Sequence, residues 1–145
     1  MALSETHQKA ARERLRRVGL RPTRQRVALA GLLFGGSDRH VTAEQLHGEA
    51  MARGIKVSLA TVYNTLHQFN HVGLLREVVV DPNRSYFDTN ISHHYHFYFE
   101  REGRLQDVPG HEIVISSLPE IPEGTEVSRV DVIVRLREKT SSLER

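Results

Sequence analysis

The segment VTAEQLHGEAMARGIKVSLATVYNTLHQF, residues 41–69, decides the fold of the first half of the chain. Thr42 is followed three residues later by a glutamine, the spacing of a capping box, and this predicts a helix over 42–53. After a glycine and a short turn, Ser58 caps a second helix that runs to about residue 71. Two helices joined by so short a turn predict a helix-turn-helix unit.

The flanking residues extend this pattern on both sides. Helical composition is found over 5–18 and again from Pro22 to the glycine pair after residue 34. Two strands, 74–80 and 85–88, follow and are joined by a turn that contains proline. Helices followed by a β-hairpin are typical of a winged helix, which reads DNA through its second helix-turn-helix helix. An ordinary helical bundle is the alternative.

The two halves of the chain carry opposite charge. Residues 1–88 hold 13 Lys and Arg against 8 Asp and Glu, whereas residues 89–145 hold 7 against 10. A basic half joined to an acidic half favours a nucleic-acid-binding module fused to a second unit, although basic segments are often only solvated surface.

The second half reads as a small α+β unit. Strands are predicted over 93–100 and 105–108, a helix over 111–118 and a long alternating strand over 127–136. Such a unit exposes a sheet edge and an apolar face, which favours pairing with a second copy. The predicted fold is therefore α+β, with a winged-helix DNA-binding domain (1–88), a hinge (89–92) and a dimerisation and sensing domain (93–145).

Three of the nine histidines lie in one tetrapeptide, His93-His94-Tyr95-His96. Alternation along a strand places His94 and His96 on one face and His93 and Tyr95 on the other. The chain has no cysteine, so disulfides and thiolate metal sites are excluded and any ligands are nitrogen or oxygen atoms.

The predicted DNA-reading residues lie at the starts of two helices. Asn64 can contact adenine, and Thr61 or the ring of Tyr63 can meet a thymine methyl group. Phosphate or minor-groove contacts are the expected role of the others. The full set is Arg21, Thr23, Arg24, Ser58, Thr61, Tyr63, Asn64 and Thr65.

Four motifs in the same order resemble the ferric uptake regulator (Fur) superfamily: residues 19–26, residues 40–46, residues 59–66 and the later His-His-x-His strand. Residues 86–90 and 119–124 are most similar to the iron response regulator (Irr) branch. The resemblance implies a homodimer, or a tetramer, that binds double-stranded DNA at an AT-rich inverted repeat and controls iron and haem metabolism genes. It implies a repressor and not an enzyme. The cytoplasm is the expected location because the sequence has no cysteine and no apolar signal segment.

The resemblance also implies the cofactor and its ligands. The metal set matched to the family motif is His40, Asp88, His94, His96 and Asp107, with Asp at two places where the family often has Glu. Such donors suit Fe²⁺, Mn²⁺ or Zn²⁺ without choosing among them. Many family members have arginine where this chain has Asn64, and many hold zinc through Cys-x-x-Cys pairs that this chain lacks.

A second site on the opposite face has three candidate residues, His93, Tyr95 and His111. The family uses Asp at the position of Tyr95, so haem is the better interpretation of this face, with His94 and His96 as further candidate ligands. Three alternatives remain at this stage: a manganese- or zinc-responsive regulator, a metalloenzyme that activates water, and an architectural DNA-binding protein with structural histidines. No apolar run is long enough to span a membrane.

Overall fold

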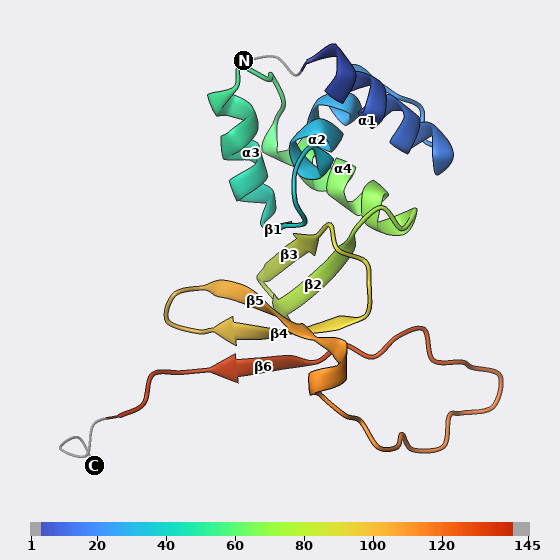
Figure 1. Cartoon of the computed structure of the whole chain (residues 1–145), viewed down its shortest axis with the longest axis vertical. Coiled ribbons are helices and arrows are strands. Elements are labelled where there is room, and N and C mark those ends of the chain that lie inside the picture. The colour runs from blue at the N-terminus through green and yellow to red at the C-terminus, as the bar shows by residue number, and fades with distance from the viewer. Residues whose placement is uncertain (1–3, 141–145) are drawn as a thin grey trace. The chain divides into compact units, whose positions relative to one another are not determined.

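The computed structural model describes residues 4–140. The chain folds into two compact units, with the boundary between Ile91 and Ser92. Figure 1 shows the helices and strands of both units. Within the described residues, none of the helices has the length and hydrophobicity that a membrane-spanning segment requires.

The first unit begins with helices whose ends are set by side-chain caps. Thr42 and Gln45 form the predicted capping box at the start of α3, and the Ser58 hydroxyl accepts a hydrogen bond from the Thr61 amide at the start of α4. Ser4 and Thr23 cap the other two helices in the same way. The helices are α1 (Glu5–Arg17), α2 (Arg24–Phe34), α3 (Ala43–Ala52) and α4 (Leu59–His71).

A three-stranded sheet in the order β1-β3-β2 completes the first unit. All its pairs are antiparallel, and β1 places His40 opposite Asp88. The turn between the two longer strands is closed by the Asp81 carboxylate, which accepts from the Asn83 amide at 2.9 Å. The strands are β1 (His40–Val41), β2 (Arg76–Asp81) and β3 (Arg84–Asp88).

The core of the first unit is formed by the apolar faces of its four helices and by Phe87 of the sheet. On α4 the predicted period places Val62, Leu66 and Phe69 inside, each 0% exposed. The prediction was wrong for Leu59, which is 37% exposed. It is the first residue of α4, one turn before Val62, the first buried residue of that helix.

The second unit is a three-stranded sheet in the order β5-β4-β6. The central strand β4 is antiparallel to β5 and parallel to β6. Its register places His96 opposite Asp107 on one side and opposite Ile133 on the other. The strands are β4 (His94–Phe99), β5 (Arg104–Pro109) and β6 (Ile133–Leu136).

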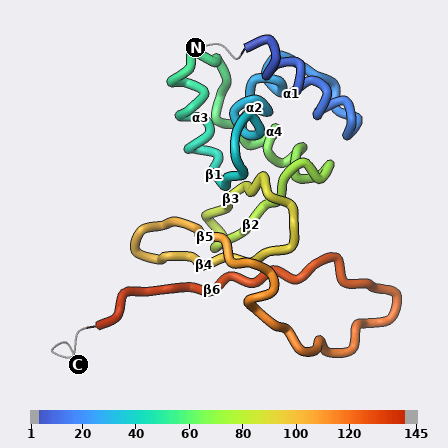
Figure 2. The backbone as a smooth tube through the Cα atoms, in the orientation of Figure 1, coloured from blue at the N-terminus to red at the C-terminus, as the bar shows by residue number. Residues whose placement is uncertain are grey.

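Two predicted elements of the second unit differ from the structure. A single 3-10 turn, Gly110–Glu112, stands where a helix over 111–118 was predicted, and the long strand over 127–136 is reduced to β6. Residues 113–132 form a wide irregular path instead (Figure 2). Val114 is 83% and Leu118 is 49% exposed, so the apolar side chains of this stretch lack the packing surface within residues 4–140 that would stabilise a helix or strand.

Candidate functional site

Strand β4 holds two buried histidines on one face. His94 and His96 are 8% and 4% exposed, and their ring centroids lie 4.7 Å apart. The neighbouring strand brings Asp107 to the same place, so that its Oδ1 atom lies 3.5 Å from Nε2 of each histidine. The sequence prediction that alternation pairs these histidines, with Asp107 on the adjoining strand, is confirmed.

The local backbone fixes which nitrogen of His94 faces Asp107. Nδ1 of His94 lies 2.8 Å from the Ser92 carbonyl oxygen. A carbonyl only accepts, so Nδ1 carries a hydrogen, and in the neutral ring this leaves the lone pair on Nε2. A backbone carbonyl on the remote ring nitrogen is the usual way in which proteins orient a metal-binding histidine.

The separations within this cluster fit a shared cation. Two ligands bound tetrahedrally to one ion at about 2.0–2.1 Å lie about 3.4 Å apart. The observed Nε2–Oδ1 distances of 3.5 Å are close to that value and are long for a hydrogen bond. All three donor atoms lie within 4.8 Å of one another. Two imidazoles and a carboxylate suit Fe²⁺, Mn²⁺ or Zn²⁺.

The remaining predicted metal ligands lie in the first unit. His40 and Asp88 face each other across the β1–β3 pair. Asp88 is 1% exposed, and its Oδ1 accepts from the Asn90 amide at 2.9 Å. The ring of His40 packs edge-on against Tyr86, with centroids 6.3 Å apart. The β1–β3 pair therefore brings together two of the predicted nitrogen and oxygen ligands.

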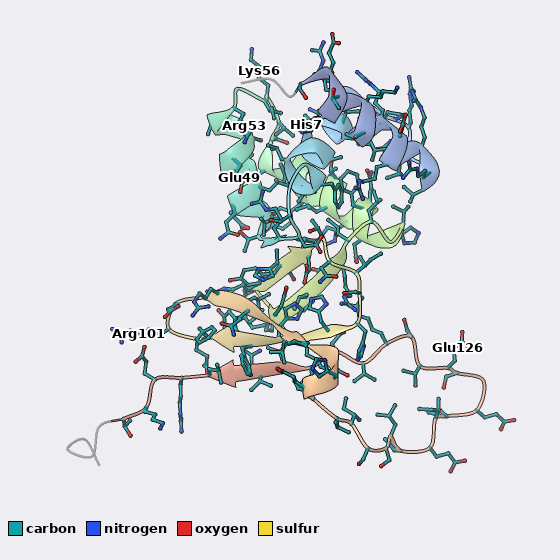
Figure 3. All side chains as sticks on the ribbon, viewed as in Figure 1. His7, Glu49, Arg53, Lys56, Arg101 and Glu126 are labelled. Carbon is teal, nitrogen blue, oxygen red and sulfur yellow. The ribbon has the colours of Figure 1, made fainter. Side chains whose placement is uncertain are left out.

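The side chain of Arg39, which directly precedes β1, forms an ion pair with a residue of α3. Its guanidinium donates to both carboxylate oxygens of Glu49, at 2.8 and 2.5 Å, and to the Leu32 carbonyl. The hydrogen bond to Glu49 raises the pKa of Arg39 above its ordinary value. Figure 3 labels Glu49 on α3. Because Arg39 precedes His40, this ion pair fixes the backbone that carries a candidate ligand.

The opposite face of β4 offers fewer ligands. The rings of His93 and Tyr95 pack edge to face with centroids 5.0 Å apart, and Tyr95 is 5% exposed. His111 is exposed in the 3-10 turn. Across residues 4–140, neither His93 nor His111 belongs to a group of three or more histidine or carboxylate donors that could hold an ion.

The predicted DNA-reading residues gather mainly around one hollow of the first unit. Its volume is about 390 Å³, and it lies between the start of α2 and the exposed side of α4. Asn64 is exposed there, whereas Thr65 is only 4% exposed, so Thr65 belongs to the core and has little surface for a phosphate. Five of the predicted residues line this hollow: Arg21, Thr23, Thr61, Asn64 and Thr65.

The other predicted DNA-reading residues have different surroundings. Arg24 is exposed and lines a separate hollow of about 510 Å³ with Arg12 of α1. The hydroxyl of Ser58 donates to Thr61 Oγ1 at 2.9 Å as well as capping α4. Tyr63 is 37% exposed on α4.

Three residues that line the hollow were missed from the sequence: Gln25, Arg26 and Gln68. Arg26 donates from Nε and Nη2 to Oε1 of Gln68, at 3.2 and 3.1 Å, and from Nη1 to the Arg21 carbonyl at 2.9 Å. Both acceptors are neutral, so the positive charge of Arg26 is held in place without being neutralised by them. The sequence did contain a signal for Arg26. It lies three residues after Thr23, whose side chain caps α2.

A family model described as the ferric uptake regulator family matches residues 17–135. The chain belongs to the ferric uptake regulator family. Regulators of this family bind DNA and act as dimers. They are transcription regulators and not enzymes, which confirms the prediction that this member is no enzyme.

Two peroxide-responsive repressors are similar to part of this chain. The peroxide-responsive repressor PerR of Staphylococcus epidermidis is 34% identical over 93 residues, which are 64% of this chain and 61% of that protein. PerR of Staphylococcus aureus strain Mu50 is also 34% identical over 93 residues and is matched over 62% of its length. The chain thus spans about three-fifths of the length of these curated relatives.

Two solved structures of ferric uptake regulators are similar to this protein over most of its length. The ferric uptake regulator of Pseudomonas aeruginosa with manganese has a TM-score of 0.68 at 27% identity and covers 90% of this chain and 98% of that one. The Vibrio cholerae regulator has a TM-score of 0.66 at 18% identity, over 87% and 98% of the two chains. This second likeness shows the fold alone.

Proposed function

We propose that this protein is a metal-responsive transcription regulator that binds DNA as a homodimer and represses its target genes. The observation that carries the proposal is the cluster of His94, His96 and Asp107, whose donor atoms have the spacing of ligands to one divalent cation. Family membership and the similarity to peroxide-responsive repressors support the regulatory role.

The first unit is the proposed DNA-binding domain, a winged helix. In this proposal α3 and α4 form the helix-turn-helix, α4 enters the major groove, and the β2–β3 hairpin is the wing. The exposed Tyr63 and Asn64 on α4 support this assignment. Arg26 supports it as well, because hydrogen bonds to Gln68 hold its positively charged guanidinium in the hollow that Asn64 also lines. The positive charge of this half of the chain favours the phosphate backbone.

The proposed regulatory ion is bound by His94, His96 and Asp107, with His40 and Asp88 as the further ligands that the family motif implies. A bound divalent cation supplies a fixed positive charge that holds several ligands in one arrangement. The residues of this chain supply the rest: the Ser92 carbonyl orients His94, and the Arg39–Glu49 pair holds the strand of His40. We propose that ion binding changes the affinity of the dimer for an AT-rich inverted repeat.

The input we favour is iron, as in the Irr branch that the sequence resembles, and manganese or zinc is the alternative. The mixed imidazole and carboxylate donors accept all three ions. The relation to a manganese-bound structure of 27% identity supports manganese as the first ion to test.

The test is a DNA-binding titration with the whole protein. A duplex enriched by the protein from a random pool is titrated with Mn²⁺, Zn²⁺ or anaerobic Fe²⁺, and with a chelator. We expect at least one ion to change the affinity tenfold or more. His94→Ala with His96→Ala should abolish this response, whereas His71→Ala, on the exposed end of α4, should keep it. A response that survives the loss of His94 and His96 would refute the proposed site.

Haem is a second candidate input, and the feature that favours it is the pair of His93 and Tyr95 rings on the other face of β4. Imidazole and phenolate are both axial ligands of haem iron. The measurement is an absorbance titration with haemin, in which a shifted Soret band that is lost in the double variant His93→Ala, Tyr95→Phe supports this site. A titration that matches free haemin removes haem from the proposal.

A further inference from the structure

The hydroxyl of Tyr63 is held by an acidic side chain from another helix. Tyr63 lies on α4, and its Oη donates to both carboxylate oxygens of Glu44, at 3.1 and 2.9 Å. Glu44 stands in the first turn of α3, nineteen positions earlier in the chain. The two helices of the predicted helix-turn-helix are therefore joined by a side-chain contact at the surface.

The ring of Tyr63 is also supported on its side. It stacks on His67, one turn later on α4, with centroids 6.4 Å apart and planes at 18°. His67 in turn meets Phe87 edge-on, with centroids 5.6 Å apart. Phe87 is 1% exposed and belongs to the core of the first unit. His67, which packs against the buried Phe87, thus supports the face of the Tyr63 ring, while Glu44 holds its hydroxyl.

The position of Glu44 is unfavourable for a surface that meets DNA. A carboxylate beside a DNA-reading helix repels the phosphate backbone and lowers sequence-independent affinity. One ordinary reason for an acidic residue there is the positive end of the α3 dipole. The helix dipole does not explain why Glu44 accepts two hydrogen bonds from Tyr63. These hydrogen bonds raise the pKa of the Tyr63 hydroxyl above its ordinary value.

We propose that Glu44 is a positioning residue, which fixes the Tyr63 ring in one orientation on the DNA-reading face and so raises sequence discrimination at the expense of general DNA affinity. This inference rests on the proposed DNA-binding function. A ring that is ordered before binding loses less side-chain entropy when it meets a base edge. The same carboxylate weakens binding to every sequence equally, because it acts on the phosphates.

Sequence discrimination and general DNA affinity together distinguish a positioning role of Glu44 from a general role in stability. Removing Glu44 should make the protein bind random duplexes as tightly as before or more tightly, while its preference for the enriched duplex falls. A damaged fold would instead lower both affinities together. The experiment therefore measures both affinities for each variant, with the full chain and with Mn²⁺ present.

Four variants test the contact: Glu44→Ala, Glu44→Gln, Tyr63→Phe, and Glu44→Ala combined with Tyr63→Phe. We expect Glu44→Ala and Tyr63→Phe each to lose about 3- to 10-fold in the ratio of enriched to random affinity, the range for one hydrogen bond. The double variant should lose no more than either single variant, because both remove the same contact. Glu44→Gln keeps an acceptor oxygen and should restore most of the ratio. Asp38→Ala removes an exposed charge elsewhere in this unit and should leave the ratio unchanged.

A second measurement needs no DNA. Titration of tyrosinate absorbance should show one tyrosine of high pKa in the wild-type protein that titrates lower in Glu44→Ala and is missing in Tyr63→Phe. If Glu44→Ala lowers the melting temperature and both DNA affinities, Glu44→Gln and Tyr63→Phe decide the question. Unchanged discrimination in Tyr63→Phe, a loss in Glu44→Gln as large as that in Glu44→Ala, or additive losses in the double variant would overturn the proposal. If the wild-type protein enriches no duplex at all, the proposed DNA-binding function fails instead.

Discussion

Replacing Asp107 with asparagine changes one ligand of the candidate metal cluster and little else. The two side chains have nearly the same shape, and Asp107 is 48% exposed at its side chain, so the variant should fold normally. The change removes the negative charge that Asp107 contributes beside His94 and His96. It leaves a neutral amide oxygen 3.5 Å from two imidazole nitrogens, if its position is kept.

The expected loss of metal affinity can be estimated. Changes to groups that merely orient ligands cost about 10- to 100-fold in metal affinity, so loss of a ligand charge should cost at least as much. At a free ion concentration of about 1,000 times the wild-type Kd, binding stabilises the folded protein by about 4.1 kcal/mol. A variant that binds about a hundredfold more weakly keeps about 1.4 kcal/mol at that concentration. For a small domain this difference shifts the melting temperature by about 10 °C or more.

The assay is thermal unfolding of the wild-type protein and Asp107→Asn over a range of Mn²⁺ and Zn²⁺ concentrations, with direct calorimetric titration of each ion. Glu100→Gln is the matched control, because it removes an equal charge from an exposed position at the end of β4. The control should respond to metal as the wild-type protein does. Equal metal-induced stabilisation of the wild-type protein and Asp107→Asn would refute the assignment of Asp107 as a ligand.

Four further substitutions have expected outcomes. Gly48→Ala adds a methyl group with no atom within 4 Å in helix α3 and should raise the free energy of unfolding by about 0.5–1 kcal/mol, measured in urea; a destabilised variant would contradict this. Thr42→Ala removes the capping box of the same helix and should lower that free energy by about 1 kcal/mol. Gly110→Ala would bring a Cβ to 2.3 Å from Cδ2 and 2.9 Å from the carbonyl oxygen of His93, so we expect a loss of about 1–3 kcal/mol and weaker metal binding in calorimetry. Asn64→Ala should cost about 1–3 kcal/mol of discrimination at one base pair, measured by anisotropy with single-base variants of the enriched duplex; a uniform loss over all sequences would exclude base reading.

The helices of the first unit could be predicted because their ends carry local signals. Thr42 and Ser58 cap their helices as the sequence indicated, and Gly73 follows the last turn of α4 with a φ of 80° that favours glycine. These signals depend on neighbouring residues in the chain, so no knowledge of tertiary packing was needed. The β-hairpin was predicted for the same reason, through its proline-containing turn.

The second unit was predicted less well because its elements depend on partners. Pro109-Gly110 at its start and Pro119 after its end suggested a helix over 111–118, yet Val114 and Ile115 are β-branched and both are exposed. The alternation over 127–136 suggested a long strand, but only Ile133–Leu136 pairs with β4. A periodic pattern records which surface is apolar and does not record whether another surface covers it.

The candidate site was likewise predicted only in part. The pairing of His94 with His96 follows from strand alternation, and Asp107 followed from the expected strand next to it. The contact between Glu44 and Tyr63 joins residues nineteen positions apart on two helices. Its existence depends on the packing angle of those helices, which no local signal in the sequence specifies.

The two histidines of the metal cluster are unequally secured by the sheet. His96 lies between two neighbours, β5 and β6, and its amide donates to the Val132 carbonyl at 3.3 Å. In the β4–β5 register His94 lies opposite Pro109, which has no amide hydrogen to give. Strand ends open before strand centres, so fraying starts at His94. Of the two histidines, His94 would therefore be the first to lose its place around a bound ion, so the opening of one strand end would limit how long the ion stays bound.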